Sequence, residues 1–176
     1  MKITMIACQN LLGYIGKNNK LMWNLPIDLK RFALLTTGKT LIVGRKTFES
    51  LPKNMILSKN RNFIVLSKKE GYYPWPHKTP LISVVNNVEN LIKYLAKVPQ
   101  IKQDKEIVVI GGSEIYKEFL DRDLISTIEL TTYYNEDIGD CRMPFIDYTK
   151  WELTNQVINH DFTGKLYCFF VTLVKK

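Results

Sequence analysis

Long apolar runs are absent from this sequence of 176 residues, and no stretch of it is long enough to span a bilayer. Its first residues, MKITMIACQN, lack the uninterrupted apolar core of a signal peptide, so we expect a cytoplasmic protein that binds no membrane. Cysteine and histidine are also scarce. Cys8, Cys141 and Cys168 form no C-x-x-C pair, and His77 and His160 stand near no second ligand of matching spacing. The sequence therefore predicts neither a disulfide framework nor a metal site.

Repeats, low-complexity tracts and polar linkers are missing as well, so we expect a single domain over residues 1–176 and a monomer. The charge, in contrast, is unbalanced, with a net value of +8. The cations are scattered and form no stripe interleaved with aromatic residues, which argues against nucleic-acid binding. We expect the excess to attract a small polyanion instead, such as a phosphorylated cofactor or a carboxylated substrate.

Strand-like and helical segments alternate along most of the chain. Apolar residues at i, i+3, i+4 and i+7 predict a helix over 88–98, and a capping serine predicts another over 113–120. This alternation favours a largely parallel, covered sheet, whereas 151–160 and 165–176 predict an antiparallel hairpin. The fold class is therefore α/β, with a mixed, mostly parallel central sheet, flanking helices and a C-terminal antiparallel hairpin. The other predicted strands cover 2–8, 40–43, 63–67, 81–85, 106–110 and 125–134.

The segment LMWNLPIDLKRF (21–32) places a carboxylate on an apolar stripe. If Asn24 and Pro26 begin a helix, Asp28 and Phe32 share one face at i and i+4. An acid in a first turn often only complements the helix dipole and stays in water. A carboxylate that faces the core needs a partner instead. Both interpretations are open from this segment alone.

Two glycine joints follow predicted buried strands, where ligands of such sheets gather. In LIVGRKTFES a strand runs into Gly44, and the RKT that follows offers two cations, a hydroxyl and free backbone N–H groups to an anion. In IVVIGGSEIY a strand ends at Gly111 and Gly112, which let a phosphate approach the backbone. Either joint alone is also compatible with a plain turn and helix cap, and neither is G-x-G-x-x-G.

Taken in order, the motifs resemble those of the dihydrofolate reductase family over almost the whole chain. The set comprises IGKNNKLMWNLPIDLKRF, GRKTFESLP, RNFIVLSK, VVIGGSEIY, IELT and a terminal YCF. Its most specific part is W-x-L-P-x-D-L, carried by Trp23, Leu25, Pro26, Asp28 and Leu29. The resemblance implies that the chain is an NADPH-dependent oxidoreductase. Its reaction would be reduction of 7,8-dihydrofolate to 5,6,7,8-tetrahydrofolate by hydride transfer to the pterin ring.

The resemblance also implies a substrate site. Asp28 would accept hydrogen bonds from the pterin edge with both oxygens and favour protonation of N5, while Thr131 orients the carboxyl group. Trp23 and the loop over 11–25 would close over the reactants. Arg61 would pair with the α-carboxylate of the glutamate tail; otherwise it is a solvated surface cation. The remaining substrate residues that the resemblance implies are Ile6, Ala7, Leu29, Phe32, Leu51, Ile110 and Tyr116.

For NADPH, the resemblance implies a pyrophosphate site at both glycine joints and a 2′-phosphate site at Arg45, Ser67 and Lys68. In the family, the peptide between the two adjacent glycines is cis. No protein nucleophile is needed, since the cofactor carries the hydride. The implied cofactor residues are Ala7, Ile15, Gly16, Gly44, Arg45, Lys46, Thr47, Leu66, Ser67, Lys68, Ile110, Gly111, Gly112, Ser113, Glu114, Ile115 and Tyr116.

Three features depart from the family pattern. Met22 replaces the usual proline before the tryptophan, which frees one φ angle. Glu114 stands where some members carry a cation, which would weaken the 2′-phosphate site by repulsion. The segment 52–60 is longer than usual, so the sequence does not decide which of its apolar residues covers the aminobenzoyl group. The candidates are Met55, Ile56 and Leu57.

Two other activities stay open from the sequence. One is a different NADPH-dependent reductase on the same fold, such as the pyrimidinone reductase of riboflavin synthesis, which would not need the pair Asp28 and Arg61. The other is a basic binding protein that kept the fold without catalysis. Turnover of dihydrofolate separates the first from the family reaction, and NADPH binding without turnover would favour the second.

Overall fold

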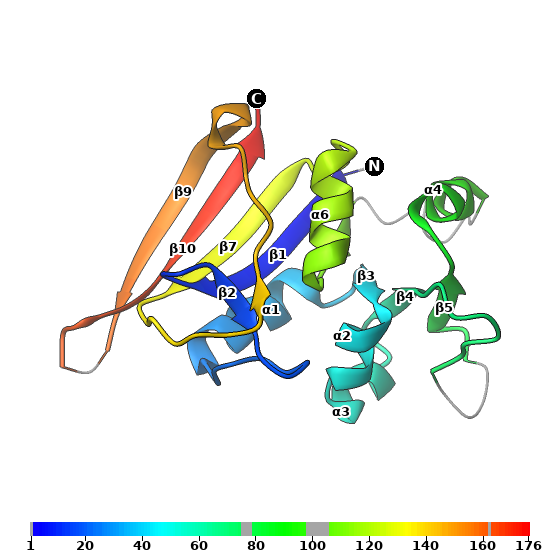
Figure 1. Ribbon diagram of the computed structural model, residues 1–176, viewed down its shortest axis with the longest axis horizontal. Coiled ribbons are helices and arrows are strands. Elements are labelled where there is room, and N and C mark those ends of the chain that lie inside the picture. The colour runs from blue at the N-terminus through cyan, green and yellow to red at the C-terminus, as the bar shows by residue number, and fades with distance from the viewer. Residues whose placement is uncertain (1, 75–78, 98–105, 162) are drawn as a thin grey trace.

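A computed structural model describes residues 2–74, 79–97, 106–161 and 163–176 of the chain (Figure 1). Its centre is an eight-stranded sheet in the order β5-β4-β3-β6-β1-β7-β10-β9. Neighbouring strands from β5 to β7 run parallel, and β10 pairs antiparallel with β7 and β9. The predicted fold class is therefore confirmed, including the hairpin at one edge. The strands of the sheet are β1 (Lys2–Asn10), β3 (Thr40–Gly44), β4 (Asn62–Leu66), β5 (Ile82–Val85), β6 (Glu106–Val109), β7 (Thr127–Tyr133), β9 (Trp151–His160) and β10 (Leu166–Lys175).

Helices and short elements complete the fold. A small antiparallel sheet pairs two segments that are far apart in the sequence, and neither was predicted as a strand. A short helix also lies within 52–60, the segment whose structure the sequence left open. These elements are β2 (Tyr14–Gly16), β8 (Cys141–Arg142), α1 (Pro26–Thr36), α2 (Arg45–Ser50), α3 (Lys53–Leu57), α4 (Val88–Lys97), α6 (Ser113–Asp121) and the 3₁₀ turn η1 (Tyr148–Lys150).

The apolar core lies on both faces of the sheet, because side chains alternate along each strand. On β6, Ile107 packs in one cluster with residues of α4 and α6, whereas Val108 packs in the opposite cluster with Phe48 of α2. Helix α1 contributes little to either cluster, since Thr36 is its only buried residue. Its position over the sheet therefore depends on a few partly buried side chains.

Two predicted helix caps are wrong by one residue, although the predicted start of the helix at 113 is correct. Leu25, rather than Asn24, is the N-cap of α1, and its apolar side chain makes no capping hydrogen bond. Gly112, rather than Ser113, is the N-cap of α6. The Ser113 hydroxyl instead donates to the Arg142 carbonyl at 2.5 Å, which links α6 to β8.

The predicted helix over 88–98 is present as α4, and residue 98 lies outside the described part of the chain. His77 also lies outside it. Within the described residues, no helix has the length and apolarity that a membrane crossing requires, and no cluster of His, Cys, Asp and Glu could hold a metal ion.

Candidate active site

The two glycine joints predicted from the sequence lie beside each other, because β3 and β6 are neighbouring strands. The Gly44 N–H donates to the Gly111 carbonyl at 2.7 Å, so the two turns are hydrogen-bonded. The Gly111–Gly112 peptide is cis, as in the family that the sequence resembles. A Cβ atom on Gly111 would lie 2.9 Å from the Tyr116 ring, and one on Gly112 would lie 3.0 Å from Thr47 Oγ1. At the second joint the backbone therefore lies so close to neighbouring side chains that glycine fits and a residue with a Cβ atom would not fit without a shift.

The residues predicted to bind phosphate come from the carboxyl ends of three neighbouring strands. Strand β4 lies beside β3, and β3 lies beside β6, so the turns that follow them meet at one edge of the sheet. Backbone N–H groups at the start of α6 point toward the same edge. The cations and hydroxyls that these turns bring together are Arg45, Lys46, Thr47, Ser67, Lys68 and Ser113.

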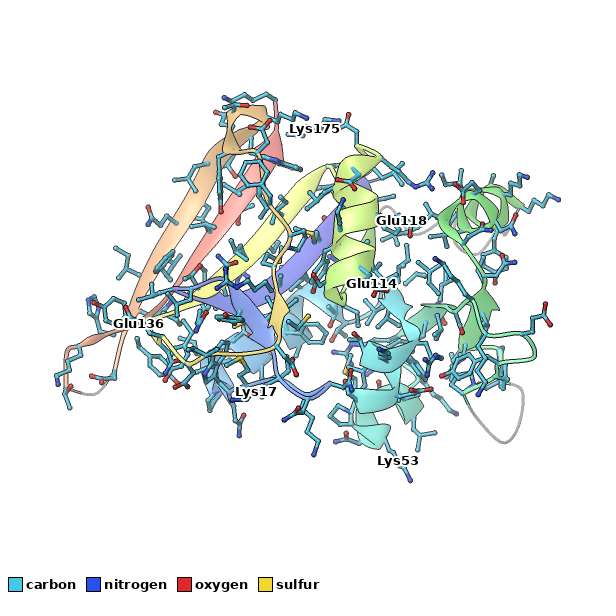
Figure 2. The ribbon with its side chains drawn as sticks, viewed as in Figure 1. Lys17, Lys53, Glu114, Glu118, Glu136 and Lys175 are labelled. Atoms are coloured by element: carbon cyan, nitrogen blue, oxygen red, sulfur yellow. The ribbon has the colours of Figure 1, made fainter. Side chains whose placement is uncertain are left out.

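Acidic side chains also stand at this edge. Arg45 Nη1 lies 3.1 Å from Glu49 Oε2, and the guanidinium carbon lies 5.9 Å from the centre of the Tyr72 ring. Glu49 and Tyr72 were not among the predicted residues, although Glu49 follows Arg45 by four residues, a spacing typical of helical ion pairs. Glu114 is exposed in the first turn of α6, at the end of that helix nearest α2 (Figure 2). A phosphate bound at Arg45 would therefore compete with a carboxylate that is already there.

Asp28 lies in the first turn of α1 and is partly buried. Burial raises the pKa of its carboxyl group, and the Thr131 hydroxyl and the Arg31 charge oppose that rise without cancelling it. Thr131 Oγ1 is itself buried and makes no hydrogen bond of regular geometry with any residue in the described ranges. A hydroxyl dipole can act on a carboxyl group at a distance or angle outside those limits. The carboxyl and hydroxyl groups are thus neighbours, and both retain hydrogen-bonding capacity.

A cavity of about 20 Å³ lies against Asp28. Ligand pockets for small molecules have volumes of roughly 300–1,000 Å³, so a bicyclic ring enters only when part of this lining moves. Four of the lining residues lie within the loop over 11–25, so a movement of that loop would displace them: Ile15, Leu21, Trp23 and Leu25. Apart from Asp28, the lining residues are apolar, aromatic or thiol: Cys8, Ile15, Leu21, Trp23, Leu25 and Leu29.

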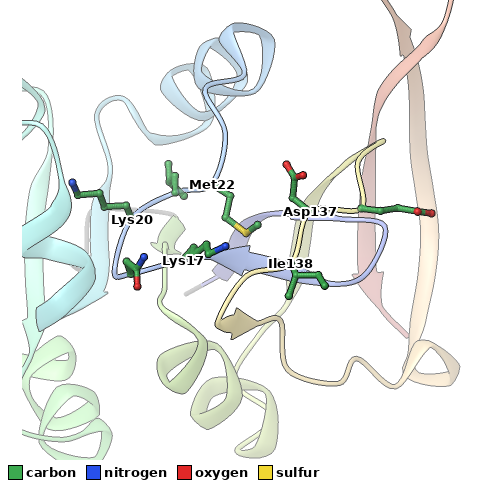
Figure 3. A pocket seen from close by; sticks show the side chains of 8 residues that line it. Lys17, Lys20, Met22, Asp137 and Ile138 are labelled. Carbon is green, nitrogen blue, oxygen red and sulfur yellow. The ribbon is translucent and has the colours of Figure 1, made fainter.

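A larger hollow, of about 780 Å³, lies between the same loop and the segment 136–138 (Figure 3). Lys17 and Lys20 face it from the loop, and Asp137 faces it from the other side. None of the predicted substrate residues lines it, and its charged walls offer little apolar surface to a ring. We therefore place the candidate site at the smaller cavity, where the Asp28 carboxyl group lies without an ion pair to any described residue.

The loop over 11–25 is held against the segment that follows β7. Trp23 Nε1 donates to Asp137 Oδ2 at 3.1 Å, and the Trp23 ring meets the Tyr133 ring edge-on at 5.5 Å between centres. The Asn18 N–H donates to Asp140 Oδ2 at 2.8 Å. Sequence reasoning found Trp23 but missed these three partners, because each of them is more than a hundred residues away along the chain.

Arg61 forms hydrogen bonds with three hydroxyl groups. Its Nε donates to Thr36 Oγ1 at 3.1 Å, its Nη2 to Thr37 Oγ1 at 3.2 Å and its Nη1 to Ser58 Oγ at 3.5 Å. No described carboxylate forms an ion pair with it, and burial lowers the pKa of the guanidinium group. Arg61 is therefore an oriented cation without a counter-charge in the described chain, rather than a freely solvated one.

Comparison with known proteins agrees with this geometry. The family model described as dihydrofolate reductase matches residues 2–175. The chain belongs to the dihydrofolate reductase family. It is 33% identical to the dihydrofolate reductase of Haemophilus influenzae over 100% of both chains, and 27% identical to that of Staphylococcus aureus over 89% of this chain and 87% of the relative. A solved structure of the dihydrofolate reductase from Enterococcus faecalis, complexed with NADP(H) and RAB-propyl, covers 99% of this chain and 96% of its own, with a TM-score of 0.81 and 29% identity.

Residues that the dihydrofolate reductase family implies for substrate and cofactor lie in the apolar clusters on both faces of the sheet. Ala7 and Tyr116, which are implied for both ligands, are buried in the cluster of α4 and α6, with Ile15 and Ile115 packed against it. The Tyr116 hydroxyl donates to the Ile6 carbonyl at 2.6 Å, and burial raises the pKa of this phenol. The opposite cluster contains the implied residues Ile6 and Ile110, with Phe32 and Leu51 packed against it.

Leu29 and the segment 52–60 differ from the other apolar candidates. Leu29 is 46% exposed, although it lines the cavity beside Asp28. In α3, Ile56 is buried in the core, Met55 is packed against the core and Leu57 is 58% exposed. Leu29 and Leu57 therefore have the most exposed apolar surface among these candidates, and Met55, Phe32 and Leu51 are partly exposed.

Proposed function

We propose that this member of the dihydrofolate reductase family reduces 7,8-dihydrofolate to 5,6,7,8-tetrahydrofolate with NADPH at the cavity beside Asp28. The observation that carries the proposal is a partly buried carboxyl group whose neighbours in the described chain leave it without an ion pair. A ligand that presents an N–H and an amine side by side satisfies both carboxylate oxygens. The apolar lining around Asp28 suits the faces of the same ring.

Asp28 has two roles in this proposal. As a carboxylate it binds and orients the ring edge, and Thr131 supports it from β7. Its negative charge also favours the protonated form of the ring nitrogen N5, which lies at the opposite part of the ring. Among the described residues, the other ionisable groups that act on Asp28 or respond to it are Cys8, Cys168, Tyr116 and Arg31. Burial keeps the two thiols and the phenol neutral, so we assign to Asp28 the role of raising the proton affinity of N5.

Arg61 supplies the second anchor for the substrate. Its guanidinium group is oriented by Thr36, Thr37 and Ser58, and these hydroxyl partners do not neutralise its charge. A carboxylate of the substrate tail would gain charge-assisted bonds at such a group. We therefore propose that Arg61 binds the tail and Asp28 binds the ring.

The cofactor residues fit a dinucleotide phosphate, since Arg45 and Lys46 directly follow Gly44 and the amino end of α6 directly follows Gly112. NADPH supplies the hydride when it is bound. We propose that Arg45, Lys68 and Ser67 hold its 2′-phosphate and that Thr47 and the start of α6 hold the pyrophosphate. Trp23 and the loop over 11–25 exclude water and align the reactants, a contribution worth up to roughly 7–11 kcal/mol in favourable cases.

Oxidation of NADPH in the presence of dihydrofolate, followed spectrophotometrically, tests the proposed function. We expect turnover with NADPH and a lower kcat/KM with NADH, by about tenfold or more for each lost phosphate contact. Arg45→Gln should reduce this preference, whereas Lys53→Gln, which removes an exposed cation of α3, should leave it unchanged. Equal efficiency with NADH would contradict the 2′-phosphate assignment, and absence of turnover would contradict the function.

We also propose that the chain works as a single-domain monomer in the cytoplasm, without nucleic acid. The scattered arrangement of its cations and the continuous eight-stranded sheet support this proposal. Light scattering coupled to size exclusion should report a mass near 20.5 kDa. A mass of twice that value, or retention on nucleic acid at physiological salt, would contradict it.

A further inference from the structure

The position of Asp28 depends on how α1 lies over the sheet. Helix α1 has a single buried residue, Thr36, and this residue is at the end of the helix far from Asp28. A cavity of about 20 Å³ adjoins Asp28. Phe32 packs against the core from the same helix, but no residue of the first turns of α1 is itself buried, so a polar interaction can set their distance from β7.

An ion pair between α1 and β7 lies alongside Asp28 and Thr131. Arg31 follows Asp28 by three residues, so the two side chains leave the helix on the same side. Glu129 precedes Thr131 by two residues, so these side chains leave β7 on the same face. Arg31 Nη2 bonds to Glu129 Oε2, and the two side chains are only 15% and 13% exposed. The pair Arg31–Glu129 is thus a second link between α1 and β7, next to the neighbours Asp28 and Thr131.

Strand β10 completes this link. The Thr172 hydroxyl donates to Glu129 Oε2 at 2.8 Å, which directs the carboxylate toward the helix. The Arg31 guanidinium carbon lies 4.8 Å from the centre of the Phe170 ring, within the range of a cation–π contact. Phe170 pairs with Thr131 across the strands. Arg31 is therefore held by groups from two strands, one of which carries Thr131.

The charge of Arg31 also reaches the site. Asp28 is faced by thiols on β1 and β10 and by a phenol on α6, namely Cys8, Cys168 and Tyr116. Burial raises the pKa of all three, to about 11 for Cys168, so they are neutral at neutral pH. Within the described residues, Arg31 is the one charged group that lowers the pKa of Asp28.

We propose that Arg31 and Glu129 are positioning residues that hold Asp28 in register with Thr131, so that the carboxylate meets the edge of the substrate ring. This inference rests on the proposed function. It assigns a role to two residues that lie within the quoted motifs LMWNLPIDLKRF and IELT but to which the sequence analysis gave no function. It also explains why a mostly buried ion pair lies beside a carboxyl group that has none. A pair that served only folding would affect stability and leave substrate binding unchanged.

The test compares Arg31→Met with the matched control Lys39→Met. Lys39 also pairs with a carboxylate, Glu106, and its side chain is 26% exposed, but this pair lies at the amino ends of the strands. We expect Arg31→Met to raise the Kd for dihydrofolate and to lower kcat/KM about tenfold or more. The kinetic comparison is made at a pH where the parent rate is level. We expect Lys39→Met to lower Tm with both kinetic values within about twofold of the parent.

The pH profile separates positioning from simple destabilisation. The rate falls as the pH rises, because the reaction needs a proton at the ring. Loss of the Arg31 charge favours proton uptake at the site, so the pH at which the rate has fallen by half should be higher in Arg31→Met than in the parent. Arg31→Lys keeps the charge and should keep the parental midpoint. If Arg31→Met does not fold, Glu129→Gln provides the test, since it leaves the Arg31 charge in place and should raise the Kd without an upward shift.

Each result decides a different point. A parental Kd and midpoint in the folded Arg31→Met variant, or a parental Kd in Glu129→Gln, would overturn the inference and leave the proposed function intact. Absence of dihydrofolate turnover in the parent enzyme would overturn the proposed function and this inference together. A raised Kd for dihydrofolate in Arg31→Met and in Glu129→Gln, with a parental Kd and kcat/KM in Lys39→Met, would establish the positioning role.

Discussion

Two carboxylates at opposite ends of the parallel strands have contrasting surroundings. Glu106, at the amino end of β6, bonds to Lys39 and Thr4, and Lys2 Nζ lies 3.8 Å from its Oε1. Burial alone would raise the pKa of Glu106, yet these bonds and charges hold it below the ordinary value. Asp28, near the carboxyl ends of β1 and β7, forms no ion pair with any described residue. The Thr131 hydroxyl and the Arg31 charge lower its pKa, but burial outweighs them and keeps the pKa above the ordinary value.

This contrast separates a carboxylate that serves the fold from one that awaits a ligand. The protein neutralises Glu106 with its own cations, so the group is satisfied before anything binds. An ionised Asp28 is costly in the empty protein, because a partly buried charge lacks compensating partners. A ligand that donates two N–H groups recovers that cost on binding. The cations Lys39 and Arg61 show the same contrast. Lys39 pairs with a carboxylate, whereas the partners of Arg61 in the described part of the chain are three hydroxyl groups.

The largest expected effect comes from Asp28→Asn. This change keeps the size and one acceptor but removes the charge that favours protonation of the ring, so turnover at neutral pH should fall by about 10² to 10⁴. The remaining rate should keep rising as the pH is lowered, through the range where the parent rate is level, because only substrate protonated in solution reacts. Steady-state kinetics between pH 5 and 9 measure both effects.

Glu106→Gln is the matched control for this experiment. It removes the same charge from the paired carboxylate, and its activity per folded molecule should equal that of the parent. Circular dichroism verifies that both variants are folded. Near-parental activity of Asp28→Asn with an unchanged profile would show that Asp28 is only a first-turn acid and that the contrast has no functional meaning.

A smaller effect is expected from Arg61→Ala. Hydrogen bonds to charged groups contribute roughly 1.5–3 kcal/mol, so loss of this cation should raise the KM for dihydrofolate by about 10- to 100-fold. A pterin substrate without the glutamate tail should be almost unaffected. Equal losses for the two substrates would mean that Arg61 acts by holding α1 through its hydroxyl contacts rather than by binding the tail.

The elements best predicted from sequence are those whose signal is local. Buried strands such as β3 and β6 are short continuous apolar runs bounded by glycine, and their predicted ends agree to within a residue or two. Strands β2 and β8 have two or three residues each and exist because they pair with each other across the chain. No periodicity can reveal such strands, and α3 is likewise too short to show one.

The candidate site divides in the same way. Asp28 and the glycines at 111 and 112 stand out because their chemistry is unusual for their local pattern. Asp137 and Glu129 do not, since an acid on a loop or strand has no local sign of the tryptophan or arginine that it will contact. Their roles depend on contacts between distant segments, which only the folded chain shows.

Stability should respond in the opposite order to activity. Glu106→Gln breaks a bonded ion pair whose carboxylate is 24% exposed, so we expect it to lower the free energy of unfolding by about 1 kcal/mol, or Tm by roughly 2–4 °C. Asp28→Asn should raise stability slightly at neutral pH, because it removes a charge that burial disfavours. Urea unfolding of the two variants beside the parent measures the difference, and a large loss in Asp28→Asn would indicate a structural role.

The smallest and sharpest effect is the pH dependence of those differences. Since the pKa of Glu106 is lower in the folded protein, its stabilisation is present above the ordinary carboxyl value of about 4 and disappears as the pH falls through the folded value. The pKa of Asp28 is higher in the folded protein, so its ionisation destabilises the fold as the pH rises above about 4. Relative to the parent, Glu106→Gln should therefore be less stable and Asp28→Asn more stable at pH 7, with both differences vanishing in acid. If the two variants differ from the parent in free energy of unfolding with the same sign, the two carboxylates are held alike. Differences of opposite sign that both vanish below pH 4 would show that the protein's own groups stabilise one ionised carboxylate and not the other.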